Sequence, residues 1–592
     1  MSTPPQGKET RMNDKESIDL LHQRIKAARR QIASELVLKK GRVVNVFSGE
    51  ILQRDVAIHQ GVIVGVGEDY TGEQEVDVQG LFIAPGLIDG HMHVESSMLL
   101  PSRLAAALLV HGTTAIISDP HEIANVMGLE GIRFMVLESE SLPLDFFFMA
   151  PSCVPATSLE TSGATLDQGS LASLREEPRM LGLAEVMDYP GVLGGDEKVL
   201  AKLRLFRGRV IDGHAPSLGA YDLQAYCSAG IQSDHEASDF HEAEEKLRAG
   251  MMILIREGTS AKNLEALVPL VTPKNSGRFC LVTDDLHPGD LLEKGHLDHV
   301  LRKSVQLGLD PLTAIQMVTV HPSEFFRLRD RGAVAPGYRA DLVVMENLEN
   351  FAVERVYKDG RLVAVGGKIC PFTQKSEDDL PLWPVRIPPL SAEMFGIRKR
   401  GAKARIIEVI PGQILTKERI DEVLSANGWV ISDIRKDILK LVVLERHKGT
   451  GRIGRGLVHG FGLQRGALAS SVAHDSHNII AVGVEDVDLF TAVEEVRRMG
   501  GGLVAAEGGR ILAKVALEIA GLMSKEPLEL LSTQIKALSR AAKSLGCILP
   551  EPFMSLSFLS LPVIPELKLT DRGLVDVRTV AVVPLFVEEE HL

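Results

Sequence analysis

Between Pro85 and about Leu328, short apolar runs alternate with helical stretches, and this alternation most limits how the 592-residue chain can fold. Strand-like runs separated by helices are typical of βα units, which build a parallel sheet. Eight units in a stretch of this length match a (β/α)8 barrel, which typically takes about 250 residues. We therefore expect an α/β fold with such a barrel over residues 85–329. The predicted strands are Gly86–Asp89, Thr113–Ser118, Asp145–Ala150, Met180–Glu185, Arg209–Asp212, Gly230–Ser233, Met251–Arg256 and Cys280–Thr283.

The segments on both sides of the predicted barrel consist of short β runs broken by glycine. Their apolar or alternating patterns are those of half-buried strands. The simplest topology is a small β domain that the barrel splits, in which residues 36–84 and 330–370 pair in space. The remaining segments are an N-terminal helical extension (1–35, with a charged amphipathic helix at 16–35), a proline- and charge-rich linker (371–395) and a C-terminal α/β domain (396–592).

The amino-acid composition limits which binding partners and which cellular compartment we expect for this chain. The formal net charge of −14 argues against a nucleic-acid partner, because phosphate binding requires clustered Lys and Arg. Five cysteines without CxxC spacing favour reduced thiols over a disulfide framework. No apolar run is long enough to span a membrane, and no secretory signal is visible. We expect a cytoplasmic homodimer or higher homo-oligomer without a membrane partner.

Two histidines, His91 and His93, follow the first predicted strand of the barrel. Successive side chains on a strand point to opposite faces, so these two imidazoles share one face and Met92 points away from it. Both imidazoles can therefore reach one metal ion at the end of the strand. A His-x-His pair alone is a weak signal, because two strand histidines can also form a polar edge.

Further ligand-type side chains recur at the ends of later predicted strands, namely Glu185, His214, His235 and Asp284. In (β/α)8 barrels the chemistry lies at these C-terminal strand ends. With His91 and His93 they make six side chains, enough to hold two divalent ions with one bridging carboxylate. Any one of them alone could be a capping residue or a hydrogen-bonded core histidine. Their common position on one rim favours a metallohydrolase.

The whole arrangement resembles the amidohydrolase superfamily and, within it, the bacterial adenine deaminases. The resemblance covers nearly the whole chain, and its motifs together are highly specific. Ser471–Ile480 is similar to the signature of the C-terminal domain that distinguishes adenine deaminases from plainer amidohydrolases. The other matching segments are Pro85–Ser97, Ser118–Val126, Gly213–Pro216, Ser233–Glu236, Thr283–Asp285 and Pro336–Leu342.

This resemblance implies hydrolytic deamination of adenine to hypoxanthine and ammonia, in purine salvage, with water as the second substrate. It implies two divalent metal ions per chain, which generate hydroxide near neutral pH. Many binuclear amidohydrolases carry a carboxylated lysine at the end of the fourth strand, where this chain has Glu185. A glutamate bridge and the acidic ligand Asp284 make a hard, anionic site, which favours Mn or Fe over Zn.

The roles of individual residues follow as expectations. Asp284 is a metal ligand that can also shuttle the proton to the leaving amine. Glu236 and Asp285 are expected to protonate a ring nitrogen or hold the base, and His121 and Glu122 to contact the substrate. A supporting role behind the metal ligands is an equally good interpretation for these four residues.

Two features stay open at this level. On a helix, His474 and His477 would share a face and could hold another metal ion, whereas on a loop they would cap a turn or close the barrel mouth. We favour a structural or site-covering role, together with Asp475, over a third metal site. Cys153 is interpreted as a core residue, because no activating base is evident. The alternatives to adenine deamination are hydrolysis of another amino-heterocycle or cyclic amide and, in a different class, a non-catalytic scaffold of the same fold.

Overall fold

The computed structural model describes residues 9–587 except 261, 374–379 and 381–384, with side chains described from residue 18 onward. Its centre is a barrel of eight parallel strands in the predicted order. Nearly all of their residues are buried, as expected of parallel strands covered on both faces. The strands are β6 (Leu87–Met92), β7 (Thr113–Ser118), β8 (Asp145–Ala150), β9 (Met180–Val186), β10 (Val210–Gly213), β11 (Ser233–Asp234), β12 (Met252–Arg256) and β13 (Phe279–Val282).

Two sets of backbone contacts close the barrel. One sheet runs from β10 through β9, β8 and β7 to β6, and a second joins β11, β12 and β13. The amide of Gln232 donates to the carbonyl of Ile211 at 3.0 Å, which joins the β10 and β11 sides. The amide of Asp284 donates to the carbonyl of His91 at 3.0 Å, which joins the end of β13 to β6. The polar residues that follow β13 therefore lie beside the end of β6.

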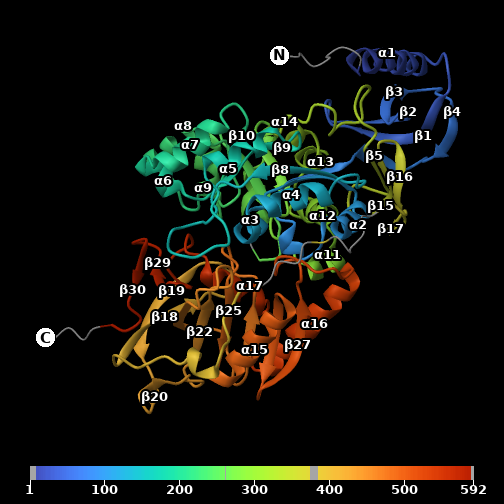
Figure 1. The fold of residues 1–592 in the computed structure, drawn as a ribbon. Coiled ribbons are helices and arrows are strands. Elements are labelled where there is room, and N and C mark those ends of the chain that lie inside the picture. Colours follow the sequence, from blue (N-terminus) through green and yellow to red (C-terminus); the bar gives the residue numbers. More distant parts are fainter. Residues whose placement is uncertain (1–8, 261, 374–379, 381–384, 588–592) are drawn as a thin grey trace, which may run out of the picture.

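Helices surround the barrel strands, as Figure 1 shows in blue-green to yellow. Most are short, and several begin with proline or with an aspartate that caps the first turn, such as Asp196 before α7 and Asp239 before α9. They are α2 (Pro101–Leu109), α3 (His121–Met127), α4 (Leu129–Glu138), α5 (Gln168–Ala172), α6 (Tyr189–Gly194), α7 (Glu197–Leu205), α8 (Ala220–Ser228), α9 (Phe240–Arg248), α10 (Leu264–Leu267), α11 (Pro288–Lys294), α12 (Leu297–Gln306), α13 (Pro311–Met317) and α14 (Val320–Phe325).

A nine-stranded sheet combines the segments before and after the barrel. Strand β5 pairs with β1 on one side and with β14 on the other, so the two halves of the small β domain form one sheet. The strands are β1 (Ser34–Asn45), β2 (Glu50–His59), β3 (Val62–Gly67), β4 (Gly72–Asp77), β5 (Phe82–Pro85), β14 (Leu342–Met345), β15 (Val353–Lys358), β16 (Arg361–Val365) and β17 (Lys368–Ile369).

The N-terminal helix differs from the sequence-based expectation. Helix α1 (Glu9–Ala28) begins seven residues before the predicted start at residue 16 and ends seven residues before the predicted limit at residue 35, and β1 already begins at Ser34. The helix ends where Arg30 takes a left-handed backbone conformation with φ 58°. Beyond it, the residues from Ser34 onward are mostly buried and pair with β2 and β4, and this pairing overrides the helical pattern. Much of the predicted linker 371–395 lies outside the described residues.

The C-terminal part of the chain is built on an eight-stranded sheet. Helix α15 (Asp486–Met499) packs on β24, β25 and β26, while α16 (Leu528–Ser544) packs on β27 and on barrel helix α11. The sheet, in the order β19-β18-β23-β22-β25-β24-β26-β27, consists of β18 (Lys403–Val409), β19 (Thr416–Glu422), β22 (Ile438–Leu444), β23 (Ile453–His459), β24 (Ala467–Ser470), β25 (Ile479–Gly483), β26 (Gly502–Glu507) and β27 (Arg510–Ala516). Smaller elements are β20 (Ser425–Ala426), β21 (Trp429–Val430), α17 (Pro552–Ser557), β28 (Leu567–Thr570), β29 (Gly573–Asp576) and β30 (Ala581–Val583).

The loop that follows β8 fastens the C-terminal domain to the barrel. The amide and hydroxyl of Thr161 donate to the buried carboxylate of Asp571 at 2.8 and 2.7 Å. The side-chain amide of Asn478 donates to the carbonyl of Thr161 at 2.8 Å. Figure 1 shows the orange and red C-terminal domain below the barrel, with this loop between them. In the described part of the chain, no helix has the length and apolarity needed to cross a membrane.

Candidate active site

The two histidines of the first barrel strand reach the site through the geometry of β6. His91 and His93 flank Met92, whose side chain is fully buried in the core. The rings of both histidines are themselves almost fully buried. Their Nε2 atoms lie 3.5 and 3.2 Å from Oδ1 of Asp284, which follows β13 in a left-handed backbone conformation with φ 60°. A non-glycine residue in that region is uncommon and often marks a functional site.

Glu185 lies at the centre of the cluster, at the end of β9. Its Oε1 is 3.4 Å from Nε2 of His93, and its Oε2 is 2.6 Å from Nδ1 of His214 and 3.2 Å from Nε2 of His235. The two oxygens therefore face different histidines. Burial opposes the charged form, but the hydrogen bonds from His214 and His235 hold the pKa of Glu185 well below its usual range. This is the position that a bridging carboxylate requires.

Arg256, the last residue of β12, joins two carboxylates of the cluster. Its Nη1 lies 2.5 Å from Oε1 of Glu236 and 2.8 Å from Oδ2 of Asp284, and its Nη2 lies 3.0 Å from Oε2 of Glu236. Burial would raise the pKa of both carboxyls, but the guanidinium outweighs it. The pKa of Glu236 falls to about 2, and that of Asp284 lies well below its usual range. Both carboxylates are thereby kept ionised.

The donor set suits divalent cations. Among the described residues, five buried groups have ligand atoms that all lie within 4.8 Å of one another. They are His91, His93 and Asp284; Glu185, His214 and His235; His93, Asp119, His121 and Glu185; His91, Asp212 and His235; and Glu122, His474 and His477. The Nε2 atoms of His91 and His214 are buried and have no hydrogen-bond partner among the described residues. Buried polar atoms normally have partners. Mixed imidazole and carboxylate donors around such atoms fit first-row metal ions such as Mn, Fe or Zn.

Two aspartates orient these histidines. Asp212 Oδ2 lies 2.9 Å from Nδ1 of His91, and although burial opposes the charged form, the carboxylates of Asp212 and Asp284 outweigh it and raise the pKa of His91 to about 10. Nδ1 of His93 lies 3.1 Å from the carbonyl of Asp119, whose carboxylate accepts from His121 at 3.0 Å. Such contacts to the second ring nitrogen fix the tautomer and direction of a metal-ligating histidine.

A second group of acidic residues lies beside the histidines. The hydroxyl of Ser96 donates to Asp285 at 2.5 Å and to Glu122 at 3.3 Å. Burial raises the pKa of Glu122 well above its usual range, and the nearby Glu95 and Asp285 add to the effect. Burial and the adjacent Asp284 likewise raise the pKa of Asp285. These carboxyls are therefore suited to holding protons, in contrast to Glu236 and Asp284.

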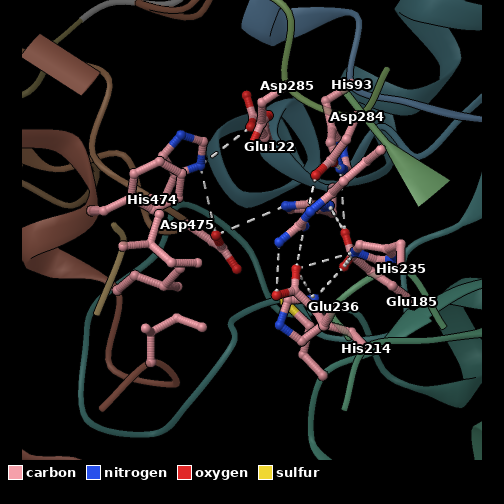
Figure 2. A pocket seen from close by; sticks show the side chains of 17 residues that line it. His93, Glu122, Glu185, His214, His235, Glu236, Asp284, Asp285, His474 and Asp475 are labelled. Carbon is pink, nitrogen blue, oxygen red and sulfur yellow. Dashed lines mark hydrogen bonds and ion pairs between the residues drawn. The ribbon is translucent and has the colours of Figure 1, made fainter. Parts of the chain in front are cut away.

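The C-terminal domain closes the pocket from the side opposite the histidine cluster. Figure 2 shows His474 and Asp475 across the cavity from Glu185 and His235. The ring of His474 stacks on Phe558, with centroids 4.5 Å apart and planes 9° apart. The free space is about 430 Å³ including its opening to solvent. The C-terminal lining residues are Ile414, His474, Asp475, Phe558, Leu561 and Ile564.

The structure brings together all the site residues named from the sequence. His91, His93, Glu185, His214, His235 and Asp284 form the central cluster, and Glu236, Asp285, His121 and Glu122 line or adjoin it. His474 and Asp475 lie on a turn and line the pocket, whereas His477 is buried behind it. Cys153 is buried outside this pocket.

Sequence reasoning missed several residues of the site. The sequence predicts Arg256 only as the last residue of a strand, although a charged side chain at the end of an apolar barrel strand falls on the rim where the chemistry of such barrels lies. Asp119 lies within the segment Ser118–Val126 and Asp212 directly precedes Gly213–Pro216, but the sequence alone gives neither aspartate a role. Phe558, Leu561 and Ile564 follow no local pattern that points to a pocket, because only the docking of the domains turns them toward it.

Two family models match the chain, the amidohydrolase family over residues 82–363 and the adenine deaminase C-terminal domain over residues 413–581. The adenine deaminase of Desulfatibacillum aliphaticivorans is 50% identical, with 95% of this chain and 99% of that protein covered. That of Dehalococcoides mccartyi is 48% identical, with the same coverage. Among solved structures, the β-aspartyl dipeptidase of Fervidobacterium islandicum AW-1 aligns with a TM-score of 0.44 and 17% identity, covering 57% of this chain and 99% of that one. The chain therefore belongs to the adenine deaminase family, whose barrel is an amidohydrolase domain.

Proposed function

We propose that this protein hydrolyses adenine to hypoxanthine and ammonia, with water as the second substrate, and serves purine salvage. The observation that carries the proposal is the cluster of six ligand-type side chains at one pocket that the C-terminal domain closes, five of which line the pocket while His91 adjoins it. Similarity to adenine deaminases over 95% of the chain supports it. A non-catalytic scaffold is disfavoured, because such a protein would not need to keep every ligand.

We propose further that two divalent metal ions are held per chain, Mn or Fe in preference to Zn. His91, His93 and Asp284 would hold one ion, and His214 and His235 the other, with Glu185 between them. The division follows two of the groups of donor atoms, His91, His93 and Asp284 and Glu185, His214 and His235. The chemistry that such ions supply is a lowered pKa of water, which yields hydroxide near neutral pH.

The residues of the chain would move the protons of the reaction. Deamination adds water to C6 of the purine and expels the amino group as ammonia. Asp284, kept ionised by Arg256, is positioned to take a proton from water and deliver it to the amine. Glu236 shares the same guanidinium and faces the pocket. Asp285 and Glu122, whose pKa values are raised, are the better donors toward a ring nitrogen.

The test is ammonia release from adenine, adenosine, guanine and cytosine, with metal content measured on each protein sample. We expect adenine to be deaminated and the other three compounds to react poorly. A metal-replete sample that leaves adenine unchanged but hydrolyses a cyclic amide would favour the alternative activity on another substrate of the amidohydrolase class. The homo-oligomeric state and the cytoplasmic location stay predictions, which sedimentation and cell fractionation measure.

A further inference from the structure

Asp475 is a buried carboxylate whose hydrogen-bonding capacity is not used within the described part of the protein. Its side chain is almost fully buried, and it lines the pocket. Its Oδ2 has no hydrogen-bond partner among the described residues. The nitrogen atoms that face Oδ1, Nε2 of His121 and Nδ1 of His474, are each 3.8 Å away, beyond hydrogen-bond distance. Buried carboxylates normally accept hydrogen bonds, so this one calls for a partner from outside the chain.

The turn that carries Asp475 is firmly held, so the direction of its carboxylate is a property of the fold. The amide of His474 donates to the carbonyl of Ser557 at 3.1 Å, and the amide of His477 donates to the carbonyl of Ala473 at 2.7 Å. The buried guanidinium of Arg446 donates to the carbonyl of His477. Contacts on both sides of Asp475 thus fix the backbone.

Asp475 faces the metal-ligand cluster across the pocket (Figure 2). A single imidazole spans the two sides, because His121 has Nε2 at 3.8 Å from Asp475 and Nδ1 at 3.4 Å from Oε1 of Glu185. Apolar side chains line the same half of the pocket, as would suit the flat faces of an aromatic heterocycle: Ile414, Phe558, Leu561 and Ile564. Beside His121, the apolar half of the pocket is therefore suited to a flat bicyclic ring that would reach from the ligand cluster toward Asp475.

We propose, on the basis of the proposed function, that Asp475 binds the substrate by accepting the N9–H of adenine and so selects the free base over its nucleosides. Adenine has two kinds of N–H donor, the 6-amino group and the ring N–H of the five-membered ring. The 6-amino group is the leaving group and must lie at the cluster of Glu185 and Asp284. The N9–H lies on the far side of the bicycle, which is where Asp475 lies. A nucleoside has no hydrogen at N9, and its sugar would meet the C-terminal domain.

The experiment compares Asp475→Ala and the isosteric Asp475→Asn with the unchanged enzyme. Asp486→Asn in the same domain is the control, because Asp486 pairs with Lys440 away from the pocket. Loss of a hydrogen bond to a charged group corresponds to roughly a 10- to 100-fold loss of affinity. We expect the KM for adenine to rise by about that factor in Asp475→Ala, by less in Asp475→Asn, and not in Asp486→Asn. Metal content and Tm should stay unchanged in all three.

The second arm uses 9-methyladenine, which lacks the N9–H, and needs no variant. We expect the unchanged enzyme to prefer adenine by about 100-fold or more in kcat/KM, and Asp475→Ala to lose most of this preference. Equal turnover of the two compounds, or an unchanged KM in a folded, metal-replete Asp475→Ala, would overturn the proposal. If kcat falls while the KM for adenine stays unchanged, the role of Asp475 is to position His121 and not to bind the substrate, which also overturns the proposal. These outcomes are distinct from a failure of the proposed function itself, in which the unchanged enzyme would release no ammonia from adenine.

Discussion

Nδ1 of His474 lies 3.2 Å from Oε1 of Glu122, so a histidine of the C-terminal domain contacts a carboxyl group of the barrel inside the pocket. In the neighbouring pair the domains are exchanged, because the histidine, His121, belongs to the barrel and the carboxylate that it faces, Asp475, belongs to the C-terminal domain. All four side chains are buried. The pocket is therefore complete only when the two domains are docked.

The first prediction concerns metal content. We expect about two divalent ions per chain in the active protein, and a lower content at both positions in Glu185→Gln, because Glu185 faces both groups of histidines. Elemental analysis of the two proteins, purified in parallel, measures this. A Glu185→Gln protein that keeps one position filled and loses only the other would show that the carboxylate does not bridge.

The histidines should separate into two classes. We expect His91→Ala and His93→Ala to deplete mainly one ion, and His214→Ala and His235→Ala the other, because the first pair groups with Asp284 and the second with Glu185. Metal content and activity as a function of added Mn measure the effect. The exposed His241 provides the control substitution His241→Ala. Four variants with indistinguishable metal loss and general unfolding would leave the assignment without support.

Asp284→Asn tests the proton shuttle. Asparagine can still contact a metal ion through its oxygen but cannot carry the proton, so the rate should fall by more than the metal loss explains. General acid–base groups contribute about 10²- to 10⁴-fold, which sets the size of the expected defect. The measurement is kcat at saturating metal. Near-normal activity of the metal-replete variant would contradict the shuttle.

Arg256 should set the pH range in which the site works. Its guanidinium holds the pKa of Glu236 and Asp284 low, so Arg256→Met should raise both pKa values. If the reaction needs these carboxylates ionised, the acid limb of the pH–rate profile moves to higher pH, and activity is lost first on the acid side. Arg256→Lys keeps the charge but not the two-pronged contact, so we expect an intermediate shift. An unmoved acid limb in Arg256→Met would contradict this role; the exposed Arg248→Met is the control.

Lys568 should make stability depend on pH. It is fully buried, it donates to the carbonyl of Ile414 at 2.8 Å, and burial lowers its pKa to about 7. In the unfolded chain the Lys568 side chain stays protonated up to about pH 10.4. The free-energy cost of burying its charge in the folded protein is therefore complete below pH 7 and decreases as the pH rises toward 10. Lys568→Met should therefore stabilise the fold below pH 7 by an amount of the order of 4 kcal/mol, less the lost hydrogen bond. The measurement is the urea midpoint of Lys568→Met and of the unchanged protein at pH 6 and at pH 10. An equal difference between the two proteins at both pH values would contradict the prediction.

The barrel strands were predictable because their signals are local. Each apolar run is bounded by helical or turn residues, and the polar residue that ends it falls on the rim by the geometry of parallel strands. The end of helix α1 was not predictable in this way. The residues from Ser34 pair with β2 and β4, and those contacts outweigh the helical periodicity of the segment.

The sequence by itself determined the order of the barrel strands and the ligand-type residues at their ends, because side-chain periodicity and strand-end position are written in neighbouring residues. Only the tertiary structure decided how Arg256 joins Glu236 to Asp284, and how Asp475 and Phe558 face a cluster on another domain. Those relationships depend on barrel closure and domain docking, which bring distant segments together through burial and hydrogen bonds that no local pattern encodes.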